Sequence, residues 1–236
     1  MHPLTILFLF IAFITGYFKY IIYFMSLIFM HEIGHVTLAL FFHWNVRKVI
    51  LLPFGGMTIF EEFVNTPIKE EFLVVLAGPL YQHLFYMLLC FLGYKTPLLT
   101  TIHFFLLGFN LLPIYPLDGS KFFLLCFEKC FSFYQSQILI TILSCLTICF
   151  LCFFPYNILF LFLLVFLSYH VFHFYKKIPF LFHKFLLERK LYSFPFQKKI
   201  YIAKVKEMKR DYEHYFIKNG CVYPEKEYLF NQVDMG

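Results

Sequence analysis

Charged residues are scarce in this sequence of 236 residues. Asp, Glu, Lys and Arg together make up 14% of it, whereas about a quarter of a typical soluble domain is charged. Hydrophobic residues make up 61%, and phenylalanine alone occurs 37 times. A small water-soluble core does not hold that many aromatic rings. The composition therefore excludes a small water-soluble protein and predicts a membrane protein with several spans.

Other features are also missing from the sequence. There are seven cysteines, but they form neither a disulfide framework nor a second cysteine pair that would complete a tetrahedral metal site. We find no internal repeat and no low-complexity segment. The first apolar run, residues 3–18, has no small-residue cleavage site. It therefore predicts a membrane span rather than a signal peptide.

Charged residues are unevenly distributed along the chain. Residues 1–175 hold seven basic and seven acidic residues, whereas residues 176–236 hold thirteen and seven, so the last segment carries the whole net charge of +6 (13 − 7). A basic segment after a last span is typically retained in the cytoplasm. We therefore predict a transmembrane domain over residues 1–175, a basic cytoplasmic region over residues 176–236, and no nucleic-acid partner.

The apolar runs predict an all-α polytopic membrane protein with about six transmembrane helices. Six spans place both termini on one side of the membrane. If that side is the cytoplasm, only Lys19 and Lys95 lie outside, in agreement with the positive-inside bias. The runs are residues 3–18, 20–42, 72–92, the stretch from 97 that continues into 109–121, 131–153 and 156–175.

Residues 47–60 interrupt this helical pattern. The segment is too short for a span and contains Pro53 and the pair Gly55 and Gly56, so it predicts a short β-hairpin with a tight glycine turn at the membrane. Irregular backbone near the bilayer needs protein or water to satisfy its polar groups. Two interpretations stay open: a strand edge that pairs with an extended peptide, and a simple interfacial hairpin.

The second apolar run contains His31, Glu32 and His35 in the order His-Glu-Ile-Gly-His. Residues four apart share one face of a helix, so the two imidazoles can chelate one zinc ion. Glu32 beside them can accept a proton from a metal-bound water molecule. A short motif of this kind also occurs by chance. Ionisable groups at membrane depth are costly and rare, however, and three within five residues favour a functional site.

A third metal ligand is expected at a break in the fourth apolar run. Pro113 and Pro116 interrupt that run, and Asp118 follows directly. A catalytic zinc site has three protein ligands and keeps one position for water. Asp118 is the only carboxylate with matching apolar surroundings, since Glu128 lies beside Lys129 and is interpreted as interfacial.

Other histidines in the apolar runs have less support as ligands. His83 has no partner at a ligand spacing, so we interpret it as a polar residue that faces the helix bundle. His170 and His173 are three residues apart, a spacing that also suits a metal site. They lie close to Lys176 and Lys177, and we interpret them as solvated.

Four short segments follow one another along the chain: His31-Glu32-Ile33-Gly34-His35, Phe54-Gly55-Gly56, Ala77-Gly78-Pro79 and NLLPIYPLDG from Asn110 to Gly119. In this order they resemble the motifs of the site-2 protease family of intramembrane zinc metalloproteases. By this resemblance, His31, His35 and Asp118 bind Zn2+. Glu32 is then the general base, and Asn110 helps to hold the substrate. The predicted substrate-binding residues are Asn110, Gly55, Gly56 and Pro116.

Within that family, the sequence resembles the sporulation members most. It has six expected spans, the residues NLLPIYPLDG in the last motif, and no inserted PDZ domain between the motifs. This resemblance implies cleavage of the pro-sequence of a membrane-associated sigma factor, inhibitory membrane proteins as further partners, and a location in the mother-cell-derived membrane around the forespore. Two positions depart from the family pattern: Ser120 replaces a second glycine, and Gln82 replaces a common asparagine. Residues 176–236 are also too short for the paired nucleotide-sensing CBS unit that some relatives carry.

Two other functional classes fit part of the pattern. A membrane metal transporter or carrier uses His and Asp side chains inside the membrane, but it needs no glutamate next to a ligand, and the sequence has no repeated half. A catalytically silent scaffold would keep the fold and lose the glutamate, yet Glu32 is present. The sequence therefore favours the protease.

Overall fold

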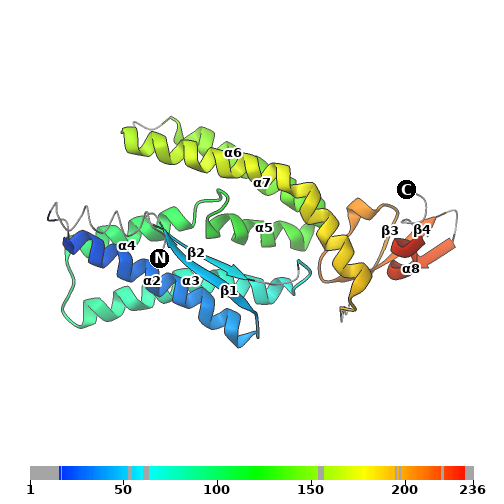
Figure 1. Ribbon diagram of the computed structural model, residues 1–236, viewed down its shortest axis with the longest axis horizontal. Coiled ribbons are helices and arrows are strands. Elements are labelled where there is room, and N and C mark those ends of the chain that lie inside the picture. Colours follow the sequence, from blue (N-terminus) through cyan, green and yellow to red (C-terminus); the bar gives the residue numbers. More distant parts are fainter. Residues whose placement is uncertain are drawn as a thin grey trace. The chain divides into compact units, whose positions relative to one another are not determined.

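The computed structural model describes residues 16, 18–52, 55–60, 64–153, 157–194, 196, 198–218 and 221–231. The first expected span, residues 3–18, lies almost entirely outside these ranges. The described chain is mostly helical (Figure 1). Its helices are α2 (Phe18–Phe41), α3 (Ile68–Phe91), α4 (Pro97–Asn110), α5 (Asp118–Cys130), α6 (Phe133–Leu151), α7 (Ile158–Leu191) and α8 (Glu225–Asn231), with a short 3₁₀-helix η1 (Val205–Glu207). Its strands are β1 (Val46–Leu52), β2 (Gly55–Phe60), β3 (Lys198–Ile202), β4 (Tyr212–Lys218) and β5 (Cys221–Pro224).

Four of the described helices, α2, α3, α6 and α7, are long and apolar enough to cross a membrane, and they correspond to four of the six predicted spans. A fifth, α4, has 14 residues, fewer than the ~20 that span a bilayer. It ends three residues before Pro113, which cannot continue a helix. α7 runs without interruption through Lys176 to Leu191, and the boundary between a transmembrane and a cytoplasmic domain stays a prediction.

Residues 1–62 and 72–111 form one compact unit. In its described part, α2 contacts α4 and both strands of the hairpin (Figure 1). The hairpin is antiparallel, with β1 paired to β2 along its length. Gly55 and Gly56 belong to β2 itself, so they contribute backbone to the ladder instead of forming the turn that the sequence predicts. Leu27 of α2 and Leu99 of α4 lie in the core of this unit.

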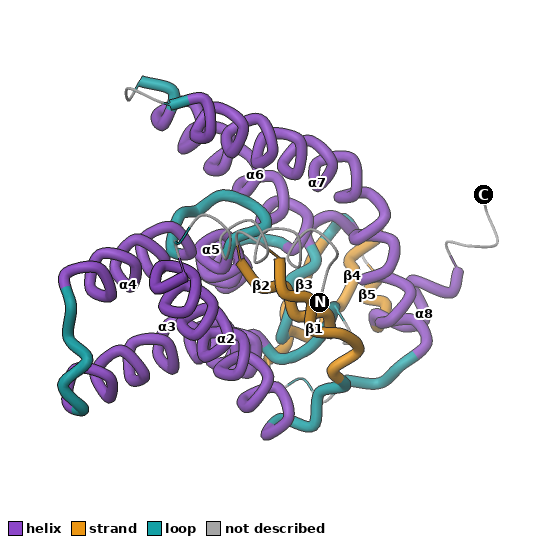
Figure 2. Tube along the Cα trace, turned by 60° about the vertical axis from the view of Figure 1, so that its left-hand side comes forward, coloured by secondary structure: helices purple, strands orange, loops and turns teal. Residues whose placement is uncertain are grey.

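Residues 63–71 and 112–236 form the second unit. In it α6 contacts both α5 and α7, and Figure 2 shows α6 and α7 side by side. Ile140 of α6 packs in a buried cluster with Phe174 and Ile178 of α7. These apolar contacts hold the two long helices of the unit together.

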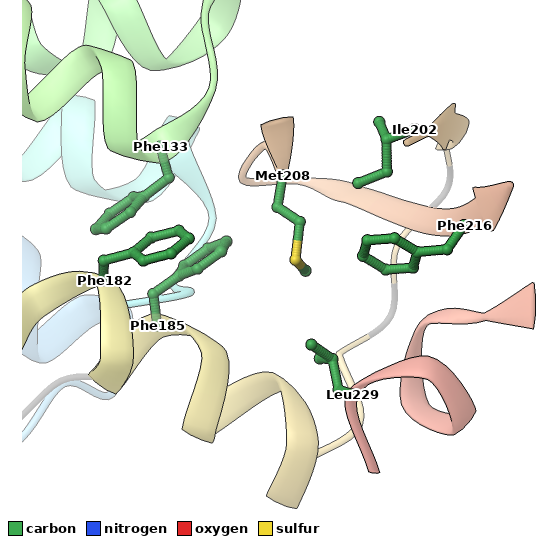
Figure 3. Close-up of a cluster of buried hydrophobic side chains, with 7 residues drawn as sticks. All are labelled: Phe133, Phe182, Phe185, Ile202, Met208, Phe216 and Leu229. Carbon is green, nitrogen blue, oxygen red and sulfur yellow. The ribbon is translucent and has the colours of Figure 1, made fainter. Parts of the chain in front are cut away.

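The last part of the chain contains a small sheet that the sequence did not predict. Its strand order is β3-β4-β5, with β3 parallel and β5 antiparallel to β4. We call this sheet together with α8 the tail sheet. Its core is continuous with the ends of the long helices, because α6 and α7 contribute three of the seven buried side chains in Figure 3. The seven are Phe133, Phe182, Phe185, Ile202, Met208, Phe216 and Leu229.

Arg189, near the end of α7, is buried within the same region. Its guanidinium lies 3.1 Å from a carboxylate oxygen of Glu225. It also donates to the backbone oxygens of Tyr212 and Lys209, at 2.7 Å and 2.8 Å. A buried charge is tolerated only when it is paired and hydrogen-bonded, so these contacts fix the tail sheet to α7.

Arg210 is a second buried arginine, and it joins three segments of its unit. It pairs with Glu128 at the end of α5 at 2.6 Å and with Glu71 in the first turn of α3 at 2.7 Å. It also donates to the backbone oxygen of Thr66. Glu128 is 1% exposed, so it is a buried ion-pair partner, and its expected position at the membrane interface stays a prediction. Its partner lies 82 residues away in the sequence.

Candidate active site

The interior of α2 carries His31, Glu32 and His35. All three side chains are buried, with 3%, 6% and 6% of their surface exposed. Their potential ligand atoms all lie within 4.8 Å of one another. Within the described ranges no other group of three His, Cys, Asp or Glu side chains gathers in this way. This cluster is therefore the candidate metal centre.

His31 and His35 face each other through their Nε2 atoms. Their Nε2 atoms are 3.1 Å apart, close to the ~3.4 Å between two ligands of a tetrahedral zinc ion with Zn–N bonds of about 2.1 Å. His35 Nδ1 donates to the backbone oxygen of Val74 at 2.8 Å, and His31 Nδ1 lies 3.0 Å from Oε1 of Gln82. A proton on each Nδ1 leaves both Nε2 lone pairs for a metal ion. The donor set therefore fits zinc.

Glycines on α2 and α3 allow this arrangement. A Cβ on Gly34 would lie 2.8 Å from the carbonyl carbon of Ala77, so the two helices approach closely because Gly34 has none. A Cβ on Gly78 would contact Nε2 of His35 and would lie 2.8 Å from Nε2 of His31. Gly78 therefore leaves open the space beside both lone pairs.

Glu32 follows His31 directly, and one residue of an α-helix turns by about 100°. Its carboxylate nevertheless has an oxygen within 4.8 Å of the histidine ligand nitrogens. A carboxylate at this distance reaches a water molecule placed between itself and the two rings. The arrangement therefore suits general-base chemistry.

Asp118, the predicted third ligand, is the first residue of α5 and belongs to the second unit. It follows the proline-containing turn, and Nζ of Lys121 lies 3.4 Å from its Oδ1. Gly119 and Ser120 beside it are buried. Because the histidines belong to the first unit, the role of Asp118 as a metal ligand stays a prediction.

The predicted substrate-binding residues lie at the ends of elements or in the connections between them. Asn110 is the last residue of α4. Gly55 and Gly56 are the first two residues of β2. Pro116 lies in the connection between α4 and α5. Their contact with a substrate stays a prediction.

Sequence reasoning missed two residues beside the candidate metal centre. In the sequence, Gln82 stands out only as a departure from a family pattern, and His103 has no partner at a ligand spacing. Both are buried, and Gln82 bonds to His31. Both are polar residues inside apolar runs, the same signal that marks His31. The sequence does not show which faces of the three apolar helices meet.

Sequence comparison matches this chain to a protein family and to individual known proteins. Residues 19–98 match peptidase family M50. Stage IV sporulation protein FB of Bacillus subtilis is 35% identical over 202 residues, which cover 80% of this chain and 70% of that protein. A zinc metalloprotease of Methanocaldococcus jannaschii is 30% identical over 129 residues, which cover 50% of this chain and 36% of that protein.

Among solved structures, the site-2 protease from Methanocaldococcus jannaschii is similar to this chain. The TM-score is 0.55 at 22% sequence identity, and the match covers 73% of this chain and 88% of that chain. At this identity the similarity concerns the fold alone.

Proposed function

Since this chain belongs to peptidase family M50, the site-2 proteases, and is an integral membrane metalloendopeptidase, we propose that it holds one zinc ion between His31, His35 and Asp118. The observation that carries the proposal is the pair of Nε2 atoms 3.1 Å apart. Each ring bonds to α3 through its Nδ1. Two histidines and one carboxylate are a common ligand set of hydrolytic zinc sites, with the fourth position left for water.

Glu32 is the general base of the proposed reaction. When bound by His31, His35 and Asp118, a zinc ion would supply a Lewis acid that polarises the scissile carbonyl and lowers the pKa of a water molecule. The Glu32 carboxylate takes a proton from that water and passes it to the leaving amine. His31 and His35 keep their orientation during the reaction because α3 holds their Nδ1 atoms.

The substrate must present an extended segment, because a helix hides its peptide groups in its own hydrogen bonds. We propose that this segment lies along β2, which is at the edge of its two-stranded sheet and can accept a further strand. Gly55 and Gly56 have no side chains that would hinder the approach of this segment. Asn110 and Pro116 are proposed to hold the same segment.

We infer that the natural substrate is the pro-sequence of a membrane-associated sporulation sigma factor. The support is the similarity to stage IV sporulation protein FB over 202 residues. In this proposal the protein acts in the mother-cell-derived membrane around the forespore, with both termini in the cytoplasm, and inhibitory membrane proteins bind it. Residues 1–175 form the membrane protease, and the basic residues 176–236 lie on the cytoplasmic side.

Glu32→Gln tests the proposed mechanism, because it keeps the size of the side chain and removes the base. The purified wild-type protein should contain about one zinc ion per chain, and the variant should retain it. Cleavage of a co-expressed membrane-tethered pro-sigma factor should fall by ~10²–10⁴-fold. Wild-type cleavage by the variant would show that Glu32 is not the general base.

Asp118→Asn is the companion variant for the third ligand. It should lose both zinc and activity, because an amide is a weaker ligand than a carboxylate. Full zinc content and full activity in this variant would remove Asp118 from the ligand set.

A further inference from the structure

A chain of polar side chains runs from His31 into the apolar interior of the first unit. Oε1 of Gln82, on α3, lies 3.0 Å from His31 Nδ1. Nε2 of Gln82 lies 3.2 Å from the backbone oxygen of His103 and 3.4 Å from its Nδ1. Nε2 of His103, on α4, lies 3.2 Å from Nδ1 of His83. Helices α2, α3 and α4 therefore share one hydrogen-bonded chain.

The backbone oxygen of His103 fixes the direction of these bonds, because a carbonyl oxygen only accepts. Gln82 must turn its NH2 group toward His103 and its oxygen toward His31. That amide oxygen also only accepts, so His31 Nδ1 donates and carries the ring proton. The reverse orientation of the amide would set two oxygens against each other. The Nε2 of His31 is thus left as a lone pair that faces Nε2 of His35.

This series of hydrogen-bonded polar side chains costs free energy inside an apolar helix bundle. Gln82 is 1% exposed and His103 is fully buried, and a polar group without partners at membrane depth strongly destabilises a protein. The ring of Tyr86 stacks on the imidazole of His103, with centroids 4.2 Å apart and an interplanar angle of 1°. This contact holds the imidazole in the orientation that faces Gln82. Apolar side chains would satisfy packing alone, so polar ones at these positions indicate a function.

The two histidines of the candidate metal centre are held in different ways. His35 donates to the backbone oxygen of Val74, which a side-chain substitution does not remove. His31 instead relies on the side chain of Gln82. Without that acceptor, the His31 tautomer with its proton on Nδ1 loses the hydrogen bond that stabilises it. The other tautomer carries the proton on Nε2, which would block the ligand atom.

We propose that Gln82 is a positioning residue for His31, and that His103 orients the Gln82 amide so that its oxygen faces the ligand. The proposal rests on the proposed function, because it takes His31 as a zinc ligand. Gln82 acts through His31. Partners of this kind typically change metal affinity by about 10–100-fold.

The test measures the zinc dissociation constant of the purified full chain in detergent by competition with a chelator. Gln82→Leu and Gln82→Met fill similar space without an acceptor oxygen, and they should bind zinc ~10–100-fold more weakly. Gln82→Glu keeps an acceptor oxygen toward His31 but loses the NH2 group that faces the His103 carbonyl, so it should bind zinc more tightly than the Leu and Met variants. Zinc affinity thus separates the role of the oxygen from the volume of the side chain.

Tyr86→Phe is the matched control. It removes a hydroxyl that lies 3.2 Å from Oγ1 of Thr100, at the same contact between α3 and α4, and it keeps the ring that stacks on His103. Its zinc affinity should equal that of the wild type. The visible absorption of the Co2+-loaded protein reports ligand geometry, so it should change in the Leu and Met variants and stay unchanged in the control.

The outcomes distinguish the proposed role of Gln82 from the proposed zinc site. Unchanged zinc affinity in a folded Gln82→Leu or Gln82→Met protein overturns the inference and leaves the zinc site standing. Equal weakening in Gln82→Glu overturns it as well, because the oxygen would then have no role. A wild-type protein that binds no zinc rejects the proposed function and this inference together. If one apolar variant is not monodisperse, the other decides.

Discussion

Gly78 leaves the space beside the two histidines open because it has no Cβ. Alanine is favoured over glycine inside a helix by about 1 kcal/mol, so Gly78→Ala should keep α3 folded. Its methyl group would lie 2.8 Å from Nε2 of His31, and at least one imidazole would have to turn away. We expect elemental analysis to find well below one zinc ion per chain, with the helix content in circular dichroism unchanged.

Gly108 on α4 provides the control for this substitution. A Cβ there meets no atom of the described chain within 4 Å. Gly108→Ala should therefore retain full zinc content and melt at the same or a slightly higher temperature. If Gly78→Ala also bound zinc fully, the metal would not lie in the space that Gly78 leaves open.

Individual residues of the site differ in how far the sequence reveals them. His31, Glu32 and His35 can be identified from the sequence because the helical repeat alone puts the two histidines on one face. Gly78 and Gln82 cannot, because their roles depend on where α3 crosses α2. That crossing depends on the close approach of Gly34 to Ala77. Because these helices are apolar on every face, the sequence does not indicate where α3 crosses α2.

At the level of elements, the tail sheet has a titratable group at its centre. His214 on β4 has a fully buried side chain. Its Nε2 accepts from the backbone N–H of Lys209 at 2.9 Å, and its Nδ1 donates to Glu225 at 2.9 Å. Burial lowers the pKa of His214, and a proton on Nε2 would break the bond from Lys209. Burial by itself would raise the pKa of Glu225, but the hydrogen bond from His214 and the charge of Arg189 lower it.

Acid should therefore loosen the tail sheet. Both pKa values are lower in the folded state, so the unfolded state binds more protons, and the stability that these groups add is lost as the pH falls. The loss begins below the ordinary histidine value of 6.5 and continues below the glutamate value of 4.5. Each proton contributes at most ~1.4 kcal/mol per pH unit. Hydrogen exchange of the β3, β4 and β5 amides, corrected for intrinsic rates, should be faster at about pH 5.5 than at about pH 7.5.

His214→Asn tests the origin of this pH dependence. Asparagine does not titrate, so the acceleration between about pH 7.5 and pH 5.5 should disappear, whatever the overall stability of the variant. Equal corrected exchange rates at both pH values in the wild type would contradict the prediction.

The elements also differ in how well the sequence predicts them. Long apolar runs give a strong signal for α2, α3, α6 and α7, and the prolines after α4 correctly mark a break. The tail sheet has strands of only five, seven and four residues, which give little periodic signal. Its core also depends on Phe133, Phe182 and Phe185 from the helices. Local sequence does not report packing between such distant segments.

The charge distribution predicts the orientation of the whole molecule in the membrane. Residues 176–236 carry a net charge of +6, which favours the cytoplasmic side. Green fluorescent protein fused after Gly236 should therefore fluoresce in living cells, and alkaline phosphatase at the same place should be inactive. A reporter inserted at Lys95, between α3 and α4, should give the opposite pattern. The reverse result at both reporter positions would overturn the predicted orientation. It would also contradict the proposal that the protein binds a sigma factor on the cytoplasmic side.

Arg210 forms ion pairs with two carboxylates from distant parts of the chain, Glu71 in α3 and Glu128 in α5. A gene with a stop codon just before position 210 would still encode every predicted zinc ligand and every apolar run. Its product would bury Glu128 without the arginine that pairs with it. Breaking a buried pair in this way costs roughly 3–5 kcal/mol, a large share of the 5–15 kcal/mol that typically stabilises a protein. The shortest reading frame for a stable enzyme therefore extends past codon 210 and does not end with the last membrane helix.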